Sequence, residues 1–308
     1  MRAPPYNSGM QHSDSTRSRE FVLTLSCRDT KGIVHGVSGL LYQAGCNILH
    51  SQQFGDVLGE DATGLFFMRV HFEAPADLAD VGTLNKLFGH VRGQFQMDAA
   101  FHSVSERSRL ILLVSKHGHC LNDLLFRWKS GQLGVDIPAI VSNHPDFSDL
   151  AASYGIPFHH LPLAAGSSAA AKREQERQIE ALIEREKIDL VVLARYMQIL
   201  SPEFCQALRG RAINIHHSFL PSFKGAKPYY QAHARGVKLI GATAHYVTAD
   251  LDEGPIIEQD VERVDHSLSA EDLTAVGRDV ECVVLARAVR WHVQRRVLMN
   301  GHKTVVFR

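Results

Sequence analysis

The chain has 308 residues, of which 45% are hydrophobic and 21% are charged, a balance typical of a globular protein with about two domains. Lysine and arginine together number 33, as do aspartate and glutamate, so the formal net charge is zero. This balance argues against a nucleic-acid-binding protein and against a membrane-surface protein, because both need a basic field. No apolar run approaches the length of a membrane span.

The N-terminal segment and the cysteines indicate a cytoplasmic protein. Residues 1–19 are rich in serine, proline and other polar residues and lack the apolar core of a signal peptide, so we expect a disordered tail. The cysteines are odd in number, widely spaced and without a Cys-x-x-Cys pair: Cys27, Cys46, Cys120, Cys205 and Cys282. This pattern predicts reduced thiols in the cytosol and offers no close ligand pair for a structural zinc site.

Residues 20–104 show the pattern of a small mixed domain. Phe21, Leu23, Leu25 and Cys27 recur at every second position, which indicates a half-buried strand. The expected elements, in chain order, are strand 21–28, helix 33–44, strand 48–54, strand 66–72, helix 83–91 and strand 96–103. The order βαββαβ predicts a ferredoxin-like unit.

After a polar linker, residues 109–308 show a different pattern. Continuous apolar runs separated by helical segments predict parallel strands buried on both faces, and therefore an α/β domain with a doubly wound, mostly parallel sheet. The expected strands are 110–114, 137–141, 190–193, 212–215 and 239–247. Helices are expected at 120–129 and 170–186, and Ser269 with Asp272 predicts a capping box that opens a long C-terminal helix.

Three polar residues lie at or beyond the ends of predicted strands of this second domain. Asn214 and His216 are two positions apart, so in an extended strand both side chains point to the same side, and Asp252 lies on a later Gly-Pro turn. A carboxamide can stabilise an oxyanion, an imidazole can transfer a proton, and a carboxylate can orient the imidazole. Acyl transfer needs these three groups, although a purely structural role for the residues remains open on this pattern alone.

Four longer motifs resemble those of folate-dependent formyltransferases. They are NIHHSFLP (214–221), GAKPY (225–229), GATAHYV (241–247) and LDEGPII (251–257). The resemblance implies that Asn214, His216 and Asp252 form the catalytic group. It also implies that a folate-binding loop lies within LARYMQIL (193–200), whose expected ligand contacts are Tyr196, Met197, Gln198, Ile199 and Leu200. The implied substrate is 10-formyltetrahydrofolate, with no prosthetic group and no metal.

Within that family the chain most resembles the branch that hydrolyses 10-formyltetrahydrofolate to formate and tetrahydrofolate, which implies a role in supplying formate for purine synthesis and in balancing one-carbon pools. A glycinamide ribonucleotide transformylase fused to a regulatory domain is one alternative. The stretch SKHGHCL (115–121) argues against it, because Lys116 and His117 replace the glycine-rich loop whose amides would hold a phosphate, although a lysine can also bind phosphate by charge.

Two further alternatives remain. A non-catalytic amino-acid sensor is disfavoured by the presence of all three catalytic residue types. A methionyl-tRNA formyltransferase is disfavoured because an additional RNA-binding domain would be expected after the long helix. His117 and His119 could ligate a metal, but no third ligand is evident from the sequence.

The N-terminal domain resembles an ACT domain, a small amino-acid-sensing module. The turns RDTKGI (28–33) and GCNI (45–48) match its usual turns. The resemblance implies a homo-oligomer formed through this domain and an amino-acid effector, glycine or methionine, bound at the seam with a partner copy. Asp29, Gly32 and Asn47 are the expected effector-binding residues. The alternative is that the two glycines only end helices and that the domain only dimerises.

Overall fold

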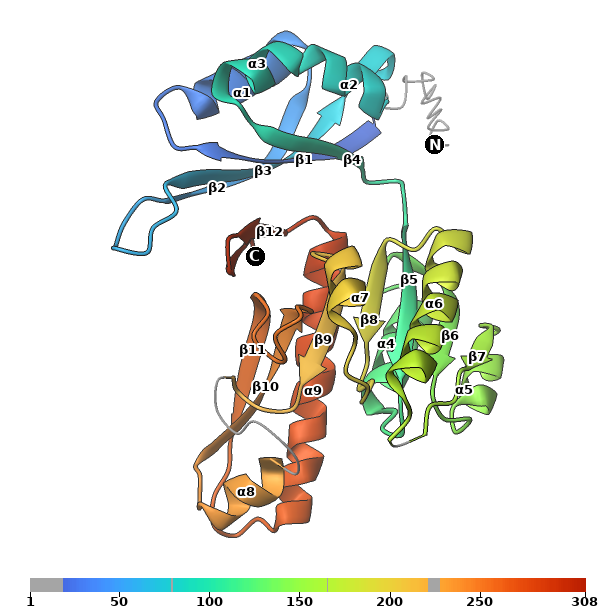
Figure 1. Cartoon of the computed structure of the whole chain (residues 1–308). Helices are drawn as coiled ribbons and strands as arrows, with labels where there is room; N and C mark the ends of the chain where they lie inside the picture. The colour runs from blue at the N-terminus through green and yellow to red at the C-terminus, as the bar shows by residue number, and fades with distance from the viewer. Residues whose placement is uncertain (1–18, 79, 165, 221–227) are drawn as a thin grey trace, which may run out of the picture. The chain divides into compact units, whose positions relative to one another are not determined.

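The computed structural model describes residues 19–308 apart from residues 79, 165 and 221–227 (Figure 1). The predicted tail therefore lies outside the described residues except for Arg19, which already belongs to the first strand. The described residues form two compact units, which divide between Glu106 and Arg107. Within the described part, every helix is too short or too polar to cross a membrane.

The first unit has the predicted βαββαβ order. Its elements are β1 (Arg19–Arg28), α1 (Ile33–Gln43), β2 (Asn47–Asp56), β3 (Leu65–Ala74), the 3-10 turn η1 (Ala76–Leu78), α2 (Val81–Leu87), α3 (Gly89–Phe95) and β4 (Asp98–Ser103). The strands form an antiparallel sheet in the order β2-β3-β1-β4. The helices α1, α2 and α3 lie on one face of it (Figure 1).

The core of this unit lies between the sheet and its helices. Phe21, Leu23, Leu25 and Cys27 are all buried there, as their alternation predicts, and the helix α1 packs its apolar face against them. One expected element differs. The single helix predicted at residues 83–91 is two short helices that meet at Phe88, next to Gly89, a residue type that weakens a continuous helix.

The second unit is a seven-stranded sheet with a small hairpin. Its elements are β5 (Ser108–Val114), α4 (His119–Lys129), β6 (Val135–Ser142), α5 (Ser148–Ser153), β7 (Phe158–His160), α6 (Ala169–Arg185), β8 (Leu190–Leu193), α7 (Pro202–Ala207), β9 (Ala212–His216), α8 (Pro228–Ala234), β10 (Leu239–Tyr246), β11 (Ile256–Arg263), α9 (Ala270–Val293), β12 (Val297–Asn300) and β13 (Lys303–Val306). The predicted capping box of Ser269 and Asp272 opens α9.

The large sheet has the order β11-β10-β9-β8-β5-β6-β7. The neighbouring strands β9, β8, β5, β6 and β7 are all parallel, whereas β10 and β11 are antiparallel to their neighbours. Alternate residues of the strands pack against α4 and α9 on one face and against α6 and α7 on the other. This confirms the predicted doubly wound, mostly parallel sheet. Because β8 and β9 are parallel neighbours, their carboxyl ends open at the same edge of the sheet.

Candidate active site

A cavity of about 340 Å³ lies at the carboxyl ends of β8 and β9. It brings together all the residues expected to carry the chemistry and to bind folate. These are Asn214, His216 and Asp252 on one side, and Tyr196, Met197, Gln198, Ile199 and Leu200 on the other. Of the motifs that suggested this site, residues 221–227 lie outside the described residues.

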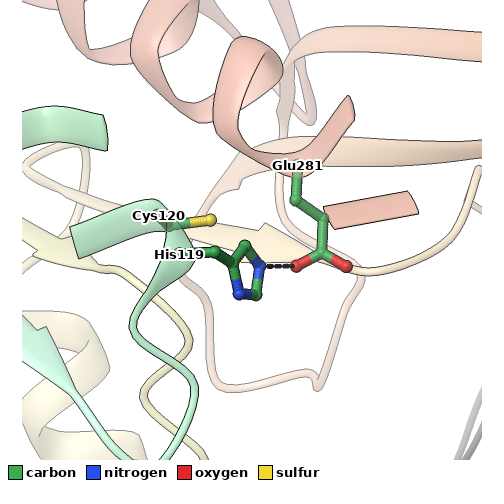
Figure 2. Close-up of side chains that lie close together, drawn as sticks. All are labelled: His119, Cys120 and Glu281. Atoms are coloured by element: carbon green, nitrogen blue, oxygen red, sulfur yellow. Dashed lines mark hydrogen bonds and ion pairs between the residues drawn. The ribbon is translucent and has the colours of Figure 1, made fainter. Parts of the chain in front are cut away.

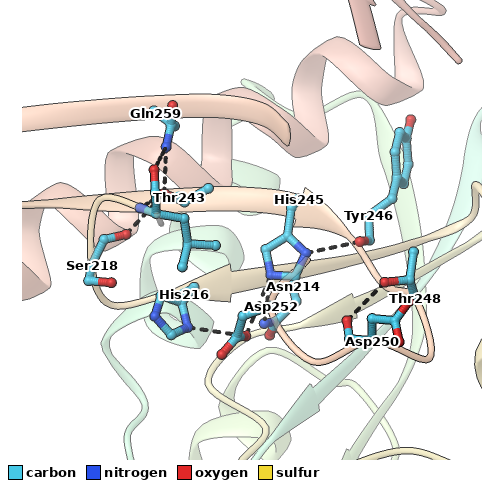
Figure 3. A network of polar contacts seen from close by, with 11 residues as sticks. Asn214, His216, Ser218, Thr243, His245, Tyr246, Thr248, Asp250, Asp252 and Gln259 are labelled. Atoms are coloured by element: carbon cyan, nitrogen blue, oxygen red, sulfur yellow. Dashed lines mark hydrogen bonds and ion pairs between the residues drawn. The ribbon is translucent and has the colours of Figure 1, made fainter. Parts of the chain in front are cut away.

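His216 and Asp252 both line this cavity and form an ion-pair contact (Figure 3). The Nδ1 atom of His216 lies 3.2 Å from Oδ1 of Asp252, and the whole His216 residue is only 5% exposed. The hydrogen bond from His216 lowers the pKa of the Asp252 carboxyl below its ordinary value. The carboxylate therefore accepts the Nδ1 proton, and Nε2 of His216 is left without a hydrogen-bond partner among the described residues. Nε2 is thus free to exchange a proton with a reactant.

His245 completes the group, and the sequence did not single it out. The antiparallel register of β9 and β10 pairs His245 with Asn214, and Nε2 of His245 lies 3.3 Å from Nδ2 of Asn214 (Figure 3). Nδ1 of His245 lies 2.9 Å from the carbonyl oxygen of Tyr246, which can only accept, so Nδ1 carries the proton. Burial lowers the pKa of His245, so the ring is neutral and Nε2 accepts from the Asn214 amide.

A tight turn brings Asp252 to the two histidines. The residue has a left-handed backbone, with φ of 59°, and the turn is closed by a hydrogen bond from the Glu253 amide to the Asp250 carbonyl. Gly254 follows, and a Cβ atom at this position would overlap the carbonyl oxygen of Tyr246. Glycine is therefore required for the chain to pass this close to β10 and to present the carboxylate.

Ser115, at the end of β5, holds the predicted folate loop. Its hydroxyl accepts from the Met197 amide at 2.9 Å and donates to Oδ1 of Asn143 at 2.7 Å, while its own amide donates to the Arg195 carbonyl. Within this loop the Met197 and Ile199 side chains are exposed, whereas Tyr196 and Leu200 are buried. The loop therefore offers an apolar surface to a ligand on a fixed backbone.

Comparisons with known proteins place this cavity in a family. Residues 108–289, more than half of the chain, match the family described as formyl transferase, and residues 21–89 match the ACT domain. The formyltetrahydrofolate deformylase of Corynebacterium sp. (strain P-1) is 47% identical over 289 residues, covering 93% of this chain and 98% of that protein. The chain belongs to the formyltetrahydrofolate deformylase family.

Solved structures agree with this membership. The formyltetrahydrofolate deformylase of Burkholderia mallei ATCC 23344 is 55% identical, with a TM-score of 0.87 over 94% of this chain and 100% of that chain. Glycinamide ribonucleotide transformylase 1 from Symbiobacterium toebii is less similar. It is 29% identical, with a TM-score of 0.62, and the match covers 67% of this chain and 97% of that one. The deformylase match thus extends over both units of the chain.

A second polar cluster lies beside this cavity. Its central residue is Glu281 of α9, which is 1% exposed. His119 donates from Nε2 to Oε2 of Glu281 at 2.7 Å, as Figure 2 shows, and the Tyr229 hydroxyl donates to Oε1 at 2.7 Å. Nε of Arg195 lies 3.4 Å from Oε2. Burial alone would raise the pKa of Glu281, but the hydrogen bond from His119 and the Arg195 charge outweigh it, so its pKa is lowered.

This cluster contains the residues that could bind a metal ion together with His119. His119, Cys120 and Glu281 place donor atoms within 4.8 Å of one another, whereas His117 is not part of the group (Figure 2). The carboxylate of Glu281 already accepts hydrogen bonds from His119 and Tyr229, and the Arg195 guanidinium lies within ion-pair distance of it. The pKa of the Cys120 thiol is raised well above its ordinary value by a hydrogen bond with Cys282 and by burial. A protonated thiol, and a carboxylate that already accepts hydrogen bonds, are poor ligands for a metal cation.

The expected effector-binding residues of the first unit do not meet in a single chain. Gly32, with φ of 95°, and Asp29 lie at the N-terminal end of α1. Asn47 starts β2 beyond the other end of that helix, and its side chain donates to Glu73 at 3.4 Å. An 11-residue helix is about 16 Å long, so a site that uses all three positions needs a second copy.

Proposed function

We propose that this chain hydrolyses 10-formyltetrahydrofolate to formate and tetrahydrofolate, with Asn214, His216 and Asp252 as its catalytic residues. The observation that carries the assignment of residues is their convergence in one cavity beside an exposed apolar loop, in a chain of the formyltetrahydrofolate deformylase family. In this role the enzyme supplies formate for purine synthesis and balances one-carbon pools.

The geometry supports a mechanism in which water attacks the formyl carbon. Asp252 accepts a hydrogen bond from Nδ1 of His216, which leaves Nε2 as the ring nitrogen available to the reactants, and the pair takes a proton from the water as the new C–O bond forms. The Asn214 amide donates one N–H to His245, and its other N–H stabilises the oxyanion. The C–N bond then breaks, the folate nitrogen receives the proton, and formate leaves.

The environment of the active site supports water, rather than an amine, as the acceptor. Residues 115–121 would have to cradle a phosphate in a ribonucleotide transferase. Here Ser115 is bonded to the folate loop, and Gly118 packs so closely on Phe147 that a Cβ would overlap the ring. His119 is bonded to Glu281. Ser115, Gly118 and His119 are therefore held by internal contacts, whereas Lys116 and His117 are exposed and stand where the glycine-rich loop would be.

Other aspects of the proposal concern the surroundings of the enzyme. We infer that it works without a resident metal, since the His119 cluster is neutralised by its own donors. The five cysteines are free thiols, which supports a reducing compartment such as the cytoplasm. The ACT domain supports regulation by an amino acid, glycine or methionine, and pairing of two copies, because Asn47 and Gly32 lie at opposite ends of α1.

The reaction is tested by mixing the purified chain with 10-formyltetrahydrofolate and measuring formate and tetrahydrofolate, with and without glycinamide ribonucleotide. We expect equal amounts of the two products and no effect of the amine. A formylated ribonucleotide formed at the rate of folate turnover, or no formate at all, would overturn the proposal.

A further inference from the structure

Arg195 carries two unfavourable features at one position, directly after β8. Its backbone is left-handed, with φ of 66°, a conformation that non-glycine residues rarely adopt. Its side chain is about nine-tenths buried, yet Nη1 and Nε have no hydrogen-bond partner among the described residues. Strained backbone and unsatisfied buried donors concentrate where a protein binds a ligand. The residue therefore points to a function that its contacts within the chain do not explain.

The guanidinium is held from one side only. Nε lies 3.4 Å from Oε2 of Glu281, whose carboxylate is itself fixed by His119 and Tyr229 at 2.7 Å each. Tyr229 reaches Glu281 by crossing Gly277, where a Cβ would overlap the tyrosine ring. The helices α4, α8 and α9 thus orient this arginine, and they leave the donor capacity of Nη1 unused.

Arg195 lies on the same cavity as the catalytic residues. It lines the cavity together with Asn214, His216 and Asp252. Its charge also acts on His217, the neighbour of His216: burial and then Arg195 lower the pKa of His217 to about 4. Because His217 is neutral, Arg195 is the charged member of this pair of residues in the cavity lining.

The charge of the product decides what this cation can do. Hydrolysis of a formyl group releases formate, an anion, whereas transfer to an amine gives a neutral formamide. Guanidinium groups bind carboxylates strongly, through charge-assisted hydrogen bonds. We propose that Arg195 is the binding residue for the formate product, held in place by Glu281. This inference rests on the proposed hydrolytic function, since only that reaction forms an anion from the formyl carbon.

The proposal is tested by formate binding, measured by isothermal titration of the full-length protein with tetrahydrofolate present. The wild type should bind formate at least about tenfold more tightly than formamide, the neutral isostere, which is a comparison on the unchanged protein. Arg195→Gln and Arg195→Asn should each weaken formate binding at least about tenfold, and asparagine tolerates the left-handed backbone. Arg278→Gln, which removes an exposed nearby charge, should leave it unchanged.

Equal affinity of the wild type for formate and formamide would overturn the proposal, and so would unchanged formate binding in both Arg195 variants. A second readout is product inhibition of hydrolysis by formate, which should weaken in both Arg195 variants and remain unchanged in Arg278→Gln. The two proposals fail separately. A chain that releases no formate from 10-formyltetrahydrofolate refutes the hydrolase, whereas formate titration needs no turnover.

Discussion

Replacing His245 with leucine tests whether this residue positions the oxyanion donor. His245 is 3% exposed, and its neutral ring accepts from Nδ2 of Asn214 at 3.3 Å. Leucine fills similar space but cannot accept a hydrogen bond. The Asn214 amide would then lose the partner that fixes its orientation, while the folate loop, which makes its contacts through Ser115, would remain unchanged.

The expected loss of kcat in His245→Leu lies between two limits. Losing one neutral hydrogen bond of about 1 kcal/mol would lower kcat about fivefold. Losing an oxyanion donor altogether costs about 3 to 4 kcal/mol, which is roughly a hundred- to thousandfold in kcat. We expect His245→Leu to fall between these limits, with KM for the folate within about twofold of wild type. His245→Gln, whose amide oxygen can still accept from Asn214, should lose less.

The assay is a double-mutant cycle on kcat, measured by formate release for His245→Leu, Asn214→Ala and the double variant. If His245 acts through Asn214, the double variant should be no slower than Asn214→Ala alone. Thermal unfolding of each variant controls for a purely structural loss. Losses that multiply in the double variant would refute the reasoning and give His245 an independent role, such as an interaction with Asp252, whose Oδ1 lies 3.8 Å away.

Three further predictions concern the turn, acidity and metal. Gly254→Ala should reduce kcat at least about a hundredfold, because the Cβ would displace the turn that carries Asp252. Gly236→Ala is the control, at a glycine with open space around its Cβ position. It should leave formate release unchanged and cause only a small loss of stability. The His217 pKa of about 4 lies below the ordinary 6.5, so its contribution to stability is complete above pH 6.5 and is lost as the pH falls toward 4. It amounts to roughly 2 to 3 kcal/mol between pH 7 and pH 4.5, and urea unfolding should show this loss in the wild type but not in His217→Asn. Chelators should leave formate release unchanged; loss of activity in EDTA that zinc or iron restores would contradict the metal-free assignment.

Local patterns in the sequence predicted the layers of the fold. The alternation in 21–28 and the apolar runs in 110–114 and 190–193 depend on which faces of a strand are buried, and the structure buries them as expected. The capping box at Ser269 and Asp272 is equally local. Short elements such as β7, with three residues, contain too few positions to show any period. They were therefore missed.

The candidate site was only partly predictable. The motifs supplied Asn214, His216 and Asp252, but the role of His245 depends on the register between β9 and β10, and a register shift of one residue would turn this side chain to the other face. The cluster around Glu281 joins residues that are up to 162 positions apart in the chain. No local pattern encodes such contacts, so Arg195 and Glu281 emerged only from the folded structure.

The most direct test of the catalytic assignment is formate release by Asp252→Asn, with folate binding measured in parallel by isothermal titration. The carboxamide keeps the shape of the side chain but cannot hold the Nδ1 proton of His216 as a carboxylate does. We expect folate affinity within about twofold of wild type and a rate at least about a hundredfold lower. Formate release close to the wild-type rate, in a variant that binds folate normally, would contradict this assignment.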